Sequence, residues 1–355
     1  MTHPYKTQPD HAFWRRAMSG IPAEALDPAI ATPFCIAPQD KVVTAGSCFA
    51  QHIGGMLEVI GFTHFVAEPA HPLFRPEDSR AFGYGQFSAR YGNIYTARQL
   101  LQLLRRAYGE FHPAEDCWEQ DGTCIDPFRP QIQPGGFTSR QEFTLDRTRH
   151  FTAVRCLVEE LDVLVFTLGL TEAWLSRKDG AAFTICPGTA GGVFNPAQHV
   201  FYNFTAQEVA ADLAACIAFL RARNLKARVV LTVSPVPLVA TARAETHVAA
   251  ATFYSKSALR VAAEMVAQSL PDVAYFPSYE IIMSRAFDAG SYFAPDKRSI
   301  TNAGVAHVMR VFASSFAGIG TTSLPLAATP SEPDTQAQID ALMQAHCDEL
   351  ALDQA

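Results

Sequence analysis

The sequence lacks long hydrophobic runs and an excess of basic residues. No run approaches the roughly 18 consecutive apolar residues of a transmembrane helix, and the opening "MTHPYKTQPDHAFWRR" has no apolar stretch typical of a secretory signal. Lys and Arg number 28 against 35 Asp and Glu, which gives a net charge of −7. Such a balance disfavours nucleic acid and anionic membranes as partners. These absences predict a cytoplasmic protein with neither a nucleic-acid nor a membrane partner.

Clustered cysteines and phosphate-binding loops are also missing. The 8 cysteines are scattered and no C-x-x-C occurs, which favours reduced thiols and argues against a zinc site. Neither Walker A nor G-x-G-x-x-G is present. The sequence therefore predicts no metal and no cofactor.

The chain is nevertheless rich enough in apolar residues to form a large core. Its 355 residues are 48% hydrophobic, which excludes wholesale disorder. We expect an N-terminal arm over 1–40, one α/β domain over 41–318 with a loop-rich insertion at about 109–145, and a linker with an amphipathic tail over 319–355.

Strand and helix patterns alternate through the central region. Alternation of this kind predicts a parallel sheet with helices on both faces. The expected strands lie at 42–45, 162–168, 227–234 and 273–276, and the expected helices at 49–60, 96–108, 145–161, 205–224, 246–269 and 301–317.

Three segments follow predicted strands and carry polar side chains. They are Gly46-Ser47-Cys48, 169–172 and 234–237. The carboxyl ends of parallel strands share one edge, where ligands bind in open α/β sheets. We therefore expect Cys48, Thr171 and Ser234 to lie at one end of the sheet, in one pocket.

Several segments together resemble the GSCFA domain family. The first is "TAGSCFAQHIG", and the others are "FTLGLTEAW", "FYNFTAQEV", "LTVSPVPLVAT" with the downstream "YSKSALR", and "AYFPSYEII". They cover roughly residues 40–315. That family is thought to belong with the SGNH, or GDSL-like, hydrolases. The resemblance implies a three-layer α/β/α sandwich and acyl or ester chemistry.

The SGNH nucleophile turn is Gly-Asp-Ser, which corresponds to Gly46-Ser47-Cys48. The resemblance places Cys48 at the nucleophile and Ser47 at the Asp, although which of the two attacks stays open. A helix N-terminus lowers the pKa of a thiol and offers backbone N–H groups to an oxyanion. The alternative is a small, half-buried cysteine packed between sheet and helix.

Further site residues follow from the same resemblance. Gly92 corresponds to the glycine whose N–H joins the oxyanion hole, with Gly83 and Gly85 nearby. Thr171 stands where Gly-x-Asn-Asp has the Asn that donates to the oxyanion, and Glu172 where it has its Asp. Ser234 completes the expected binding residues.

The family base is missing from its expected place. In the Asp-x-x-His block, Asp296 is present but Ser299 replaces the His. His307 is the nearest histidine, yet roughly eight helical residues span about 12 Å, so it is equally a structural histidine on a helix face. His150 and His199 are the other candidates. A thiolate needs less help from a base than a serine does, but a degenerate site would look the same.

Two arginine-bearing segments have ordinary alternatives. Arg129, within "DPFRP" in the insertion, could hold an anionic or sugar substrate, or belong to a surface turn with a salt bridge. The helix containing "LQLLRRAY" is expected to be core with a solvated pair, Arg105 and Arg106.

The sequence thus favours an SGNH-like acyl-transfer enzyme, an esterase-type hydrolase or an O-acyltransferase. Its substrate would be a small-molecule or glycan acyl group attacked by Cys48. The competing hypotheses are a catalytically degenerate binding module and a thiol-based sensor. The oligomeric state, the acyl donor and the acceptor stay open.

Overall fold

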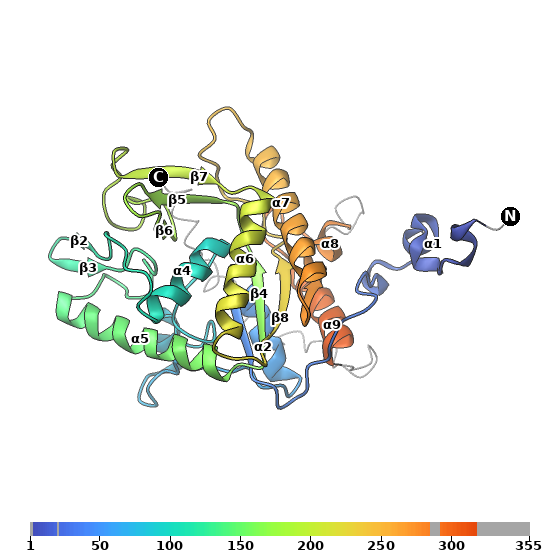
Figure 1. Cartoon of the computed structure of the whole chain (residues 1–355), viewed down its shortest axis with the longest axis horizontal. Coiled ribbons are helices and arrows are strands. Elements are labelled where there is room, and N and C mark those ends of the chain that lie inside the picture. Colours follow the sequence, from blue (N-terminus) through green and yellow to red (C-terminus); the bar gives the residue numbers. More distant parts are fainter. Residues whose placement is uncertain (1–2, 20, 285–291, 318–355) are drawn as a thin grey trace.

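A four-stranded parallel sheet forms the centre of the molecule in the computed structural model (Figure 1), which describes residues 3–19, 21–284 and 292–317. The strand order is β1-β4-β8-β9. These strands are β1 (Val42–Gly46), β4 (Val163–Leu168), β8 (Arg228–Val233) and β9 (Val273–Phe276). The strands predicted from the sequence are therefore confirmed, with boundaries that differ by one or two residues.

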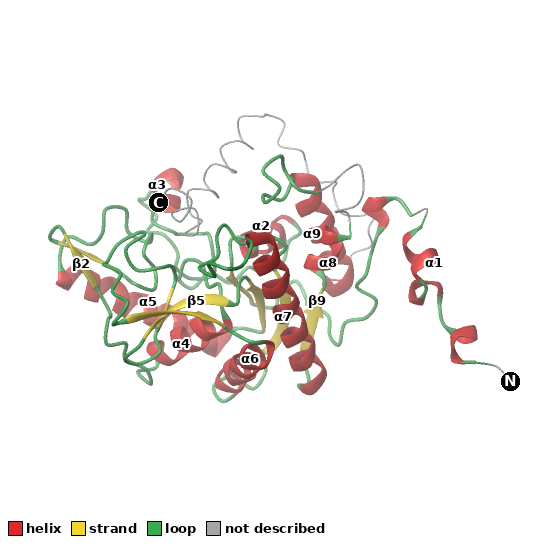
Figure 2. Cartoon of the chain, turned by 90° about the horizontal axis from the view of Figure 1, so that it is seen from above, coloured by secondary structure: helices red, strands yellow, loops and turns green. Residues whose placement is uncertain are grey.

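Helices cover both faces of this sheet, as Figures 1 and 2 show. One face packs against α4 (Ala97–Ala107), α5 (Arg140–Glu160), α6 (Ala206–Arg221) and α7 (Val248–Ser269). The other face packs against α2 (Ala50–Val59), α8 (Ser278–Met283) and α9 (Asn302–Ala317). The predicted three-layer α/β/α architecture is confirmed.

Alternation along the strands explains the two layers of core. In β4, Leu164, Phe166 and Leu168 join the core beneath α4 to α7, whereas Val163 and Val165 join the core beneath α2, α8 and α9. Successive side chains of a strand point to opposite faces. Because both faces are covered, β4 is apolar except for the buried Thr167, as buried parallel strands mostly are.

Local sequence signals fix where the flanking helices begin. Thr96 and Thr205 form capping boxes with Gln99 and Glu208 at the starts of α4 and α6. In each box the cap side chain accepts a backbone hydrogen bond and the third residue returns one. The segment around His64 has the sequence pattern of a strand, but in the structure it forms a single parallel bridge, to Val42.

Smaller elements surround the sheet. The insertion contains an antiparallel pair, β2 (Trp118–Gln120) and β3 (Thr123–Ile125), and a second antiparallel sheet follows β4. The strands of that second sheet are β5 (Glu172–Ser176), β6 (Ala182–Phe183) and β7 (His199–Asn203), in the order β6-β5-β7. The remaining helices are α1 (Trp14–Met18), α3 (Pro76–Ala81) and three 3₁₀ turns, Pro4–Thr7, Asp10–Ala12 and Ala23–Ala25.

The N-terminal arm carries α1 and projects to one side of the molecule (Figure 1). Its later part returns to the domain, where the Thr32 hydroxyl donates to the carbonyl oxygen of Ser315 in α9. The expected linker and amphipathic tail lie outside the described residues.

Candidate functional site

The turn from β1 to α2 requires glycine at position 46. Gly46 has φ of +135°, and a Cβ there would lie 2.2 Å from the carbonyl oxygen of Thr167 in β4. The next residue, Ser47, donates its N–H to that same oxygen at 3.2 Å. The turn is therefore pressed against the neighbouring strand, and Cys48 follows immediately before α2.

The two side chains of this turn differ in exposure. Ser47 is buried, and its Oγ has no hydrogen-bond partner among the residues that the structure describes. Cys48 is partly exposed, and its carbonyl oxygen accepts the N–H of Gln51 as the helix begins. A substrate approaching from solvent therefore meets the thiol and not the hydroxyl, which supports Cys48 over Ser47 as the reactive group.

Two other segments meet this turn through backbone hydrogen bonds. Ile94 donates its N–H to the carbonyl oxygen of Gly46 at 2.8 Å, and the carbonyl oxygen of Tyr95 accepts the N–H groups of Gly169 and Leu170, both at 3.0 Å. A Cβ on Gly169 would lie 3.3 Å from that of Ser47. The segment that carries Gly92, whose φ is +65°, is thereby brought beside the turn.

The segment after β8 reaches the same edge. Gly46 pairs with Thr167, and Thr167 with Thr232, so β1, β4 and β8 end in register. The N–H of Ser234 then donates to the carbonyl oxygen of Leu168 at 2.8 Å. The prediction that the three segments share one end of the sheet is confirmed. That their side chains line one pocket stays a prediction.

Thr171 is directed away from solvent. Its hydroxyl, fully buried, donates to Oδ1 of Asn203 in β7 at 2.6 Å, and its N–H donates to Oγ of Ser255 in α7 at 2.9 Å. Because its proton is already given to Asn203, the geometry argues against Thr171 as an oxyanion donor. The residue instead fixes the path of the chain from β4 into β5.

A buried lysine that the sequence reasoning did not single out lies at this edge. Lys256, in α7, is 1% exposed, and its Nζ donates to the carbonyl oxygen of Gly169 at 2.7 Å. Gly169 in turn touches Ser47. Buried ionisable groups near a strand edge are frequent at functional sites. The available signal was a lysine on the apolar face of α7, next to the buried Ser255.

The acidic residues of the expected site each accept hydrogen bonds from the protein. Glu172 accepts a hydrogen bond from the Thr241 hydroxyl at 2.7 Å, and burial raises the pKa of its carboxyl. Asp296 accepts the N–H groups of Arg298 and Ser299 and the Ser299 hydroxyl. Burial alone would raise the pKa of Asp296, but these hydrogen bonds outweigh it and lower the pKa.

The loop that carries Asp296 lies against the segment after β8. Nε of Arg298 donates to the carbonyl oxygen of Pro237 at 3.2 Å. Asp296 is thus on the side of the domain where β8 ends. Ser299, which stands where the Asp-x-x-His block has its His, is the residue whose hydroxyl donates to Asp296.

His307 serves the packing of α9. It is buried, its Nδ1 is 2.9 Å from the hydroxyl of Tyr292, and its Nε2 is 2.7 Å from the carbonyl oxygen of Leu26 in the arm. Both ring nitrogens are therefore engaged in structural contacts. This geometry argues against His307 as the catalytic base and favours the structural alternative.

The other two histidine candidates are each bound to a carboxylate away from the turn, although Nε2 of His150 has no hydrogen-bond partner among the described residues. Nδ1 of His199 accepts the N–H of Asn195, and its Nε2 is 2.9 Å from the carboxylate of Glu115. Nδ1 of His150 is 2.8 Å from Glu68, and burial together with repulsion from Arg129 lowers its pKa. Neither histidine makes a contact with the Gly46–Cys48 turn among the bonds of the described residues.

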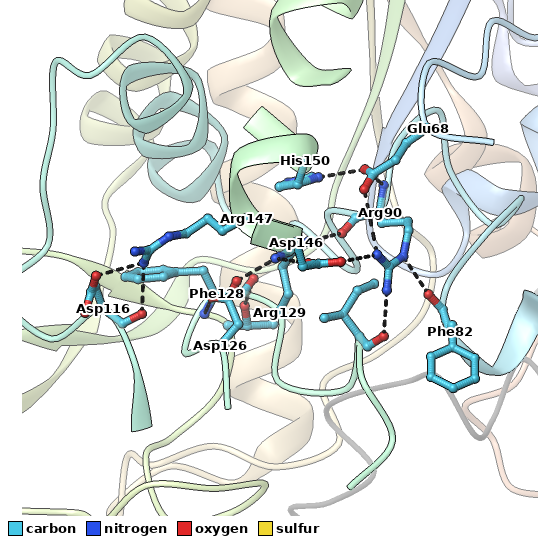
Figure 3. A network of polar contacts seen from close by, with 12 residues as sticks. Glu68, Phe82, Arg90, Asp116, Asp126, Phe128, Arg129, Asp146, Arg147 and His150 are labelled. Carbon is cyan, nitrogen blue, oxygen red and sulfur yellow. Dashed lines mark hydrogen bonds and ion pairs between the residues drawn. The ribbon is translucent and has the colours of Figure 1, made fainter. Parts of the chain in front are cut away.

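Arg129 in the insertion is buried in a cluster of charges shown in Figure 3. Its guanidinium binds Asp126 and Asp146, both at 2.8 Å, and Asp146 also binds Arg90. Glu68 is 3.8 Å from Arg90 and joins the cluster to His150. The expected salt bridge is confirmed, but the expected surface location is wrong, because Arg129 is covered by α5 and the insertion.

Comparison with known families identifies the chain. The model of the GSCFA family matches residues 41–312, which is most of the chain. The chain belongs to the GSCFA family. Its eponymous letters, from Gly46 to Ala50, are the turn between β1 and α2 described above. No curated protein was found to match the sequence.

None of the protein's described helices is long and apolar enough to cross a membrane. Within the described ranges there is no group of three or more His, Cys, Asp or Glu side chains that could hold a metal ion.

Proposed function

We propose that this GSCFA protein is an acyl-transfer enzyme, an esterase-type hydrolase or O-acyltransferase, in which Cys48 is the nucleophile. The observation that carries the proposal is the position of Cys48. It is a partly exposed thiol in the turn that leads into α2, at the carboxyl edge of a parallel sheet. That is where the active sites of open α/β sheets lie, and a helix N-terminus stabilises a thiolate.

In the proposed reaction, the thiolate of Cys48 attacks the carbonyl carbon of an ester or thioester. A C–S bond forms, and the carbonyl electron pair moves to the oxygen. Backbone N–H groups of Cys48 and Gly92 stabilise this oxyanion. Collapse then breaks the bond to the alkoxide or thiolate leaving group, which takes a proton from water. Water or an acceptor hydroxyl finally attacks the acyl-cysteine and releases the thiol.

Lys256 supports a negative charge at this edge. Its Nζ donates to the carbonyl oxygen of Gly169, and a Cβ on Gly169 would lie 3.3 Å from that of Ser47, the residue before Cys48. A cation beside a cysteine favours the thiolate form. We infer that Lys256 compensates in part for the missing histidine, and that a base is needed only to activate the acyl acceptor.

A degenerate binding module is the second candidate, and one observation favours it. Ser299, which stands where SGNH enzymes have their histidine, donates its hydroxyl to Asp296. Asp296 is therefore satisfied without an imidazole. Such a site would still bind an acyl or glycan ligand and would have lost turnover.

The test is intact-mass analysis after incubation with an activated ester, p-nitrophenyl acetate, and with acetyl and butyryl thioesters. We expect either an acyl adduct that maps to Cys48 or steady turnover, and both should disappear in Cys48→Ala. Cys156→Ala is the matched control, because burial and a hydrogen bond to Glu160 raise the pKa of that thiol. Turnover that survives Cys48→Ala, or wild-type protein with neither adduct nor turnover, would contradict the nucleophile and leave the binding module.

A further inference from the structure

Arg106 is a buried cation that forms no direct ion pair with a carboxylate of the described residues. It lies in the last turn of α4 and is only 7% exposed, whereas its neighbour Arg105 is exposed. In the part of the chain that the structure describes, the Arg106 guanidinium has neither a hydrogen bond nor an ion pair. The expected solvated pair is therefore wrong for Arg106. Buried charges are ordinarily paired and hydrogen-bonded, so the guanidinium of Arg106 is a candidate group for binding an anionic ligand.

Two aromatic rings surround the guanidinium. Its central carbon is 3.8 Å from the centroid of Phe128 and 5.2 Å from that of Phe151. Rings hold a guanidinium by its faces through cation–π attraction, whereas its N–H donors point outward in its plane. The donor edge is therefore the part of Arg106 that remains to bind a ligand.

The neighbourhood adds positive charge to that of Arg106. Burial lowers the pKa of Arg106 to about 10, and repulsion from Arg129 and Arg147 acts in the same direction, although Asp126 and Asp116 oppose it. Asp126 is already bound to Arg129, and Asp116 to Arg147 and Arg140. Both carboxylates are therefore bound to other arginines, and neither forms an ion pair with Arg106. The Arg106 guanidinium stays protonated at neutral pH.

Arg106 is one of the residues that line a pocket of about 490 Å³ at the end of α4. Arg147 and Arg155 also line it, and its apolar walls include Tyr108, Phe111 and Phe151. Pockets of about 300–1,000 Å³ hold small organic ligands. Three guanidinium groups against the single carboxylate of Asp116 leave an excess of positive charge in a protein whose net charge is −7.

We propose that this pocket binds a small organic phosphomonoester, with the phosphate oxygens on the donor edge of Arg106 and the organic part against Phe111 and Phe151. The planar fork of arginine matches phosphate oxygens in pairs. A dianionic phosphate also fits the charge excess better than a monoanionic carboxylate does. The site is separate from the Cys48 edge, because Arg106 lies in the last turn of α4, whereas Tyr95 immediately precedes the N-cap of that 11-residue helix. It does not depend on the proposed acyl transfer.

Titration calorimetry of the full-length protein tests the proposal. The probes are phenyl phosphate, inorganic phosphate, benzoate and phenol, each titrated into the millimolar range. We expect phenyl phosphate to bind more tightly than inorganic phosphate or benzoate, and phenol not to bind. Arg106→Met should lower the affinity for phenyl phosphate at least about tenfold, because a charged hydrogen bond contributes roughly that factor or more. Arg105→Met, one residue away and exposed, is the matched control and should bind as the wild type does.

Thermal melting separates a ligand site from a structural role. Arg106→Met removes a buried charge without a partner, so the melting temperature should stay the same or rise. If that variant does not fold, Arg106→Lys is the second test. It keeps the charge but loses the planar pair of N–H donors, so it should still lower the affinity for phenyl phosphate. Equal affinity in wild type and the Arg106 variants, or no binding of phenyl phosphate by the wild type, would overturn the site. Benzoate binding as tight as phenyl phosphate would overturn the phosphomonoester assignment.

Discussion

In two regions of the molecule, segments that are far apart in the sequence are held together, and different interactions hold them. At the carboxyl edge of the sheet, the segments around Gly46, Ile94 and Gly169 are joined by backbone hydrogen bonds and by glycines that permit close approach. Beside α5, the insertion is joined to the domain by buried side-chain charges centred on Arg129 and Asp146 (Figure 3).

The difference decides which substitutions each region tolerates. The stability of an edge that is held by backbone hydrogen bonds does not depend on its exposed side chains. Residues such as Cys48 and Ser299 can therefore vary there without loss of the fold. A charge cluster depends on every member, because removing one leaves a buried charge without its partner. We expect substitutions of exposed side chains at the sheet edge to affect activity more than stability. Substitutions in the charge cluster should instead lower the free energy of unfolding.

The largest expected effect is the loss of Arg129. Arg129→Met leaves Asp126 without its guanidinium and Asp146 with one fewer, so unfolding should cost about 3–5 kcal/mol less. Arg140→Met is the control, because Arg140 and Asp116 form a partly exposed ion pair worth at most about 1 kcal/mol. Urea denaturation followed by circular dichroism measures both. Similar losses in the two variants would show that the cluster is no more important than a surface ion pair.

The edge should break only where its backbone is touched. Gly46→Ala places a Cβ against the Thr167 carbonyl oxygen at a φ unfavourable to alanine, and we expect a loss of about 2–4 kcal/mol from strain and overpacking. Gly55→Ala in the exposed part of α2, where an added Cβ meets nothing within 4 Å, should instead stabilise by about 0.5–1 kcal/mol. The same urea titrations give both values, and a neutral Gly46→Ala would refute the close contact with β4.

The sequence could predict the edge because its signals are local. Strand ends, the Gly46 turn and the capping boxes of α4 and α6 are each written in a few consecutive residues. Parallel pairing then brings the strand ends together without further information. The fold and the place of Cys48 followed from these signals.

The charge cluster and the fates of the histidines could not be predicted in this way. Glu68, Arg90 and Asp146 meet from segments far apart, and no local pattern says which carboxylate finds which guanidinium. The two arginines of "LLRRAY" look alike in sequence, yet the turn of α4 exposes Arg105 and buries Arg106 under Phe128. His307 became structural because the arm returns to α9, which spacing along the chain does not reveal.

The charge cluster should also make stability depend on pH. The pKa of His150 is lowered, chiefly by burial and by repulsion from Arg129, so the unfolded chain binds the proton more readily. Stability should therefore fall as pH drops below about 6.5, by up to about 1.4 kcal/mol per pH unit for this group. His150→Gln should flatten the dependence between pH 7 and pH 5 in urea titrations.

Glu68 extends the same loss to lower pH. Burial would raise its pKa, but attraction to His150 and Arg129 and the N–H of Arg90 lower it to about 2. A carboxyl with a depressed pKa contributes stability above its ordinary pKa and loses it as pH falls toward the depressed value. His150→Gln with an unchanged slope above pH 5 would mean that other groups govern the acid sensitivity.

The smallest effect on stability, and the sharpest test of the edge, is expected at Ser299. This side chain is partly exposed and bonded only within its own loop, to Asp296. Ser299→His should change the free energy of unfolding by no more than about 0.5 kcal/mol, as surface substitutions usually do. Its imidazole can donate to Asp296 and leave the other nitrogen as a base. If Cys48 is the nucleophile, hydrolysis of p-nitrophenyl acetate should rise by about 10²–10⁴-fold, the usual contribution of a general base. Ser299→Gln can donate to Asp296 but cannot accept a proton, so it should leave hydrolysis at the wild-type rate. Equal rates in the two variants would show that position 299 does not face the thiol, and the correspondence with the Asp-x-x-His block would then fail.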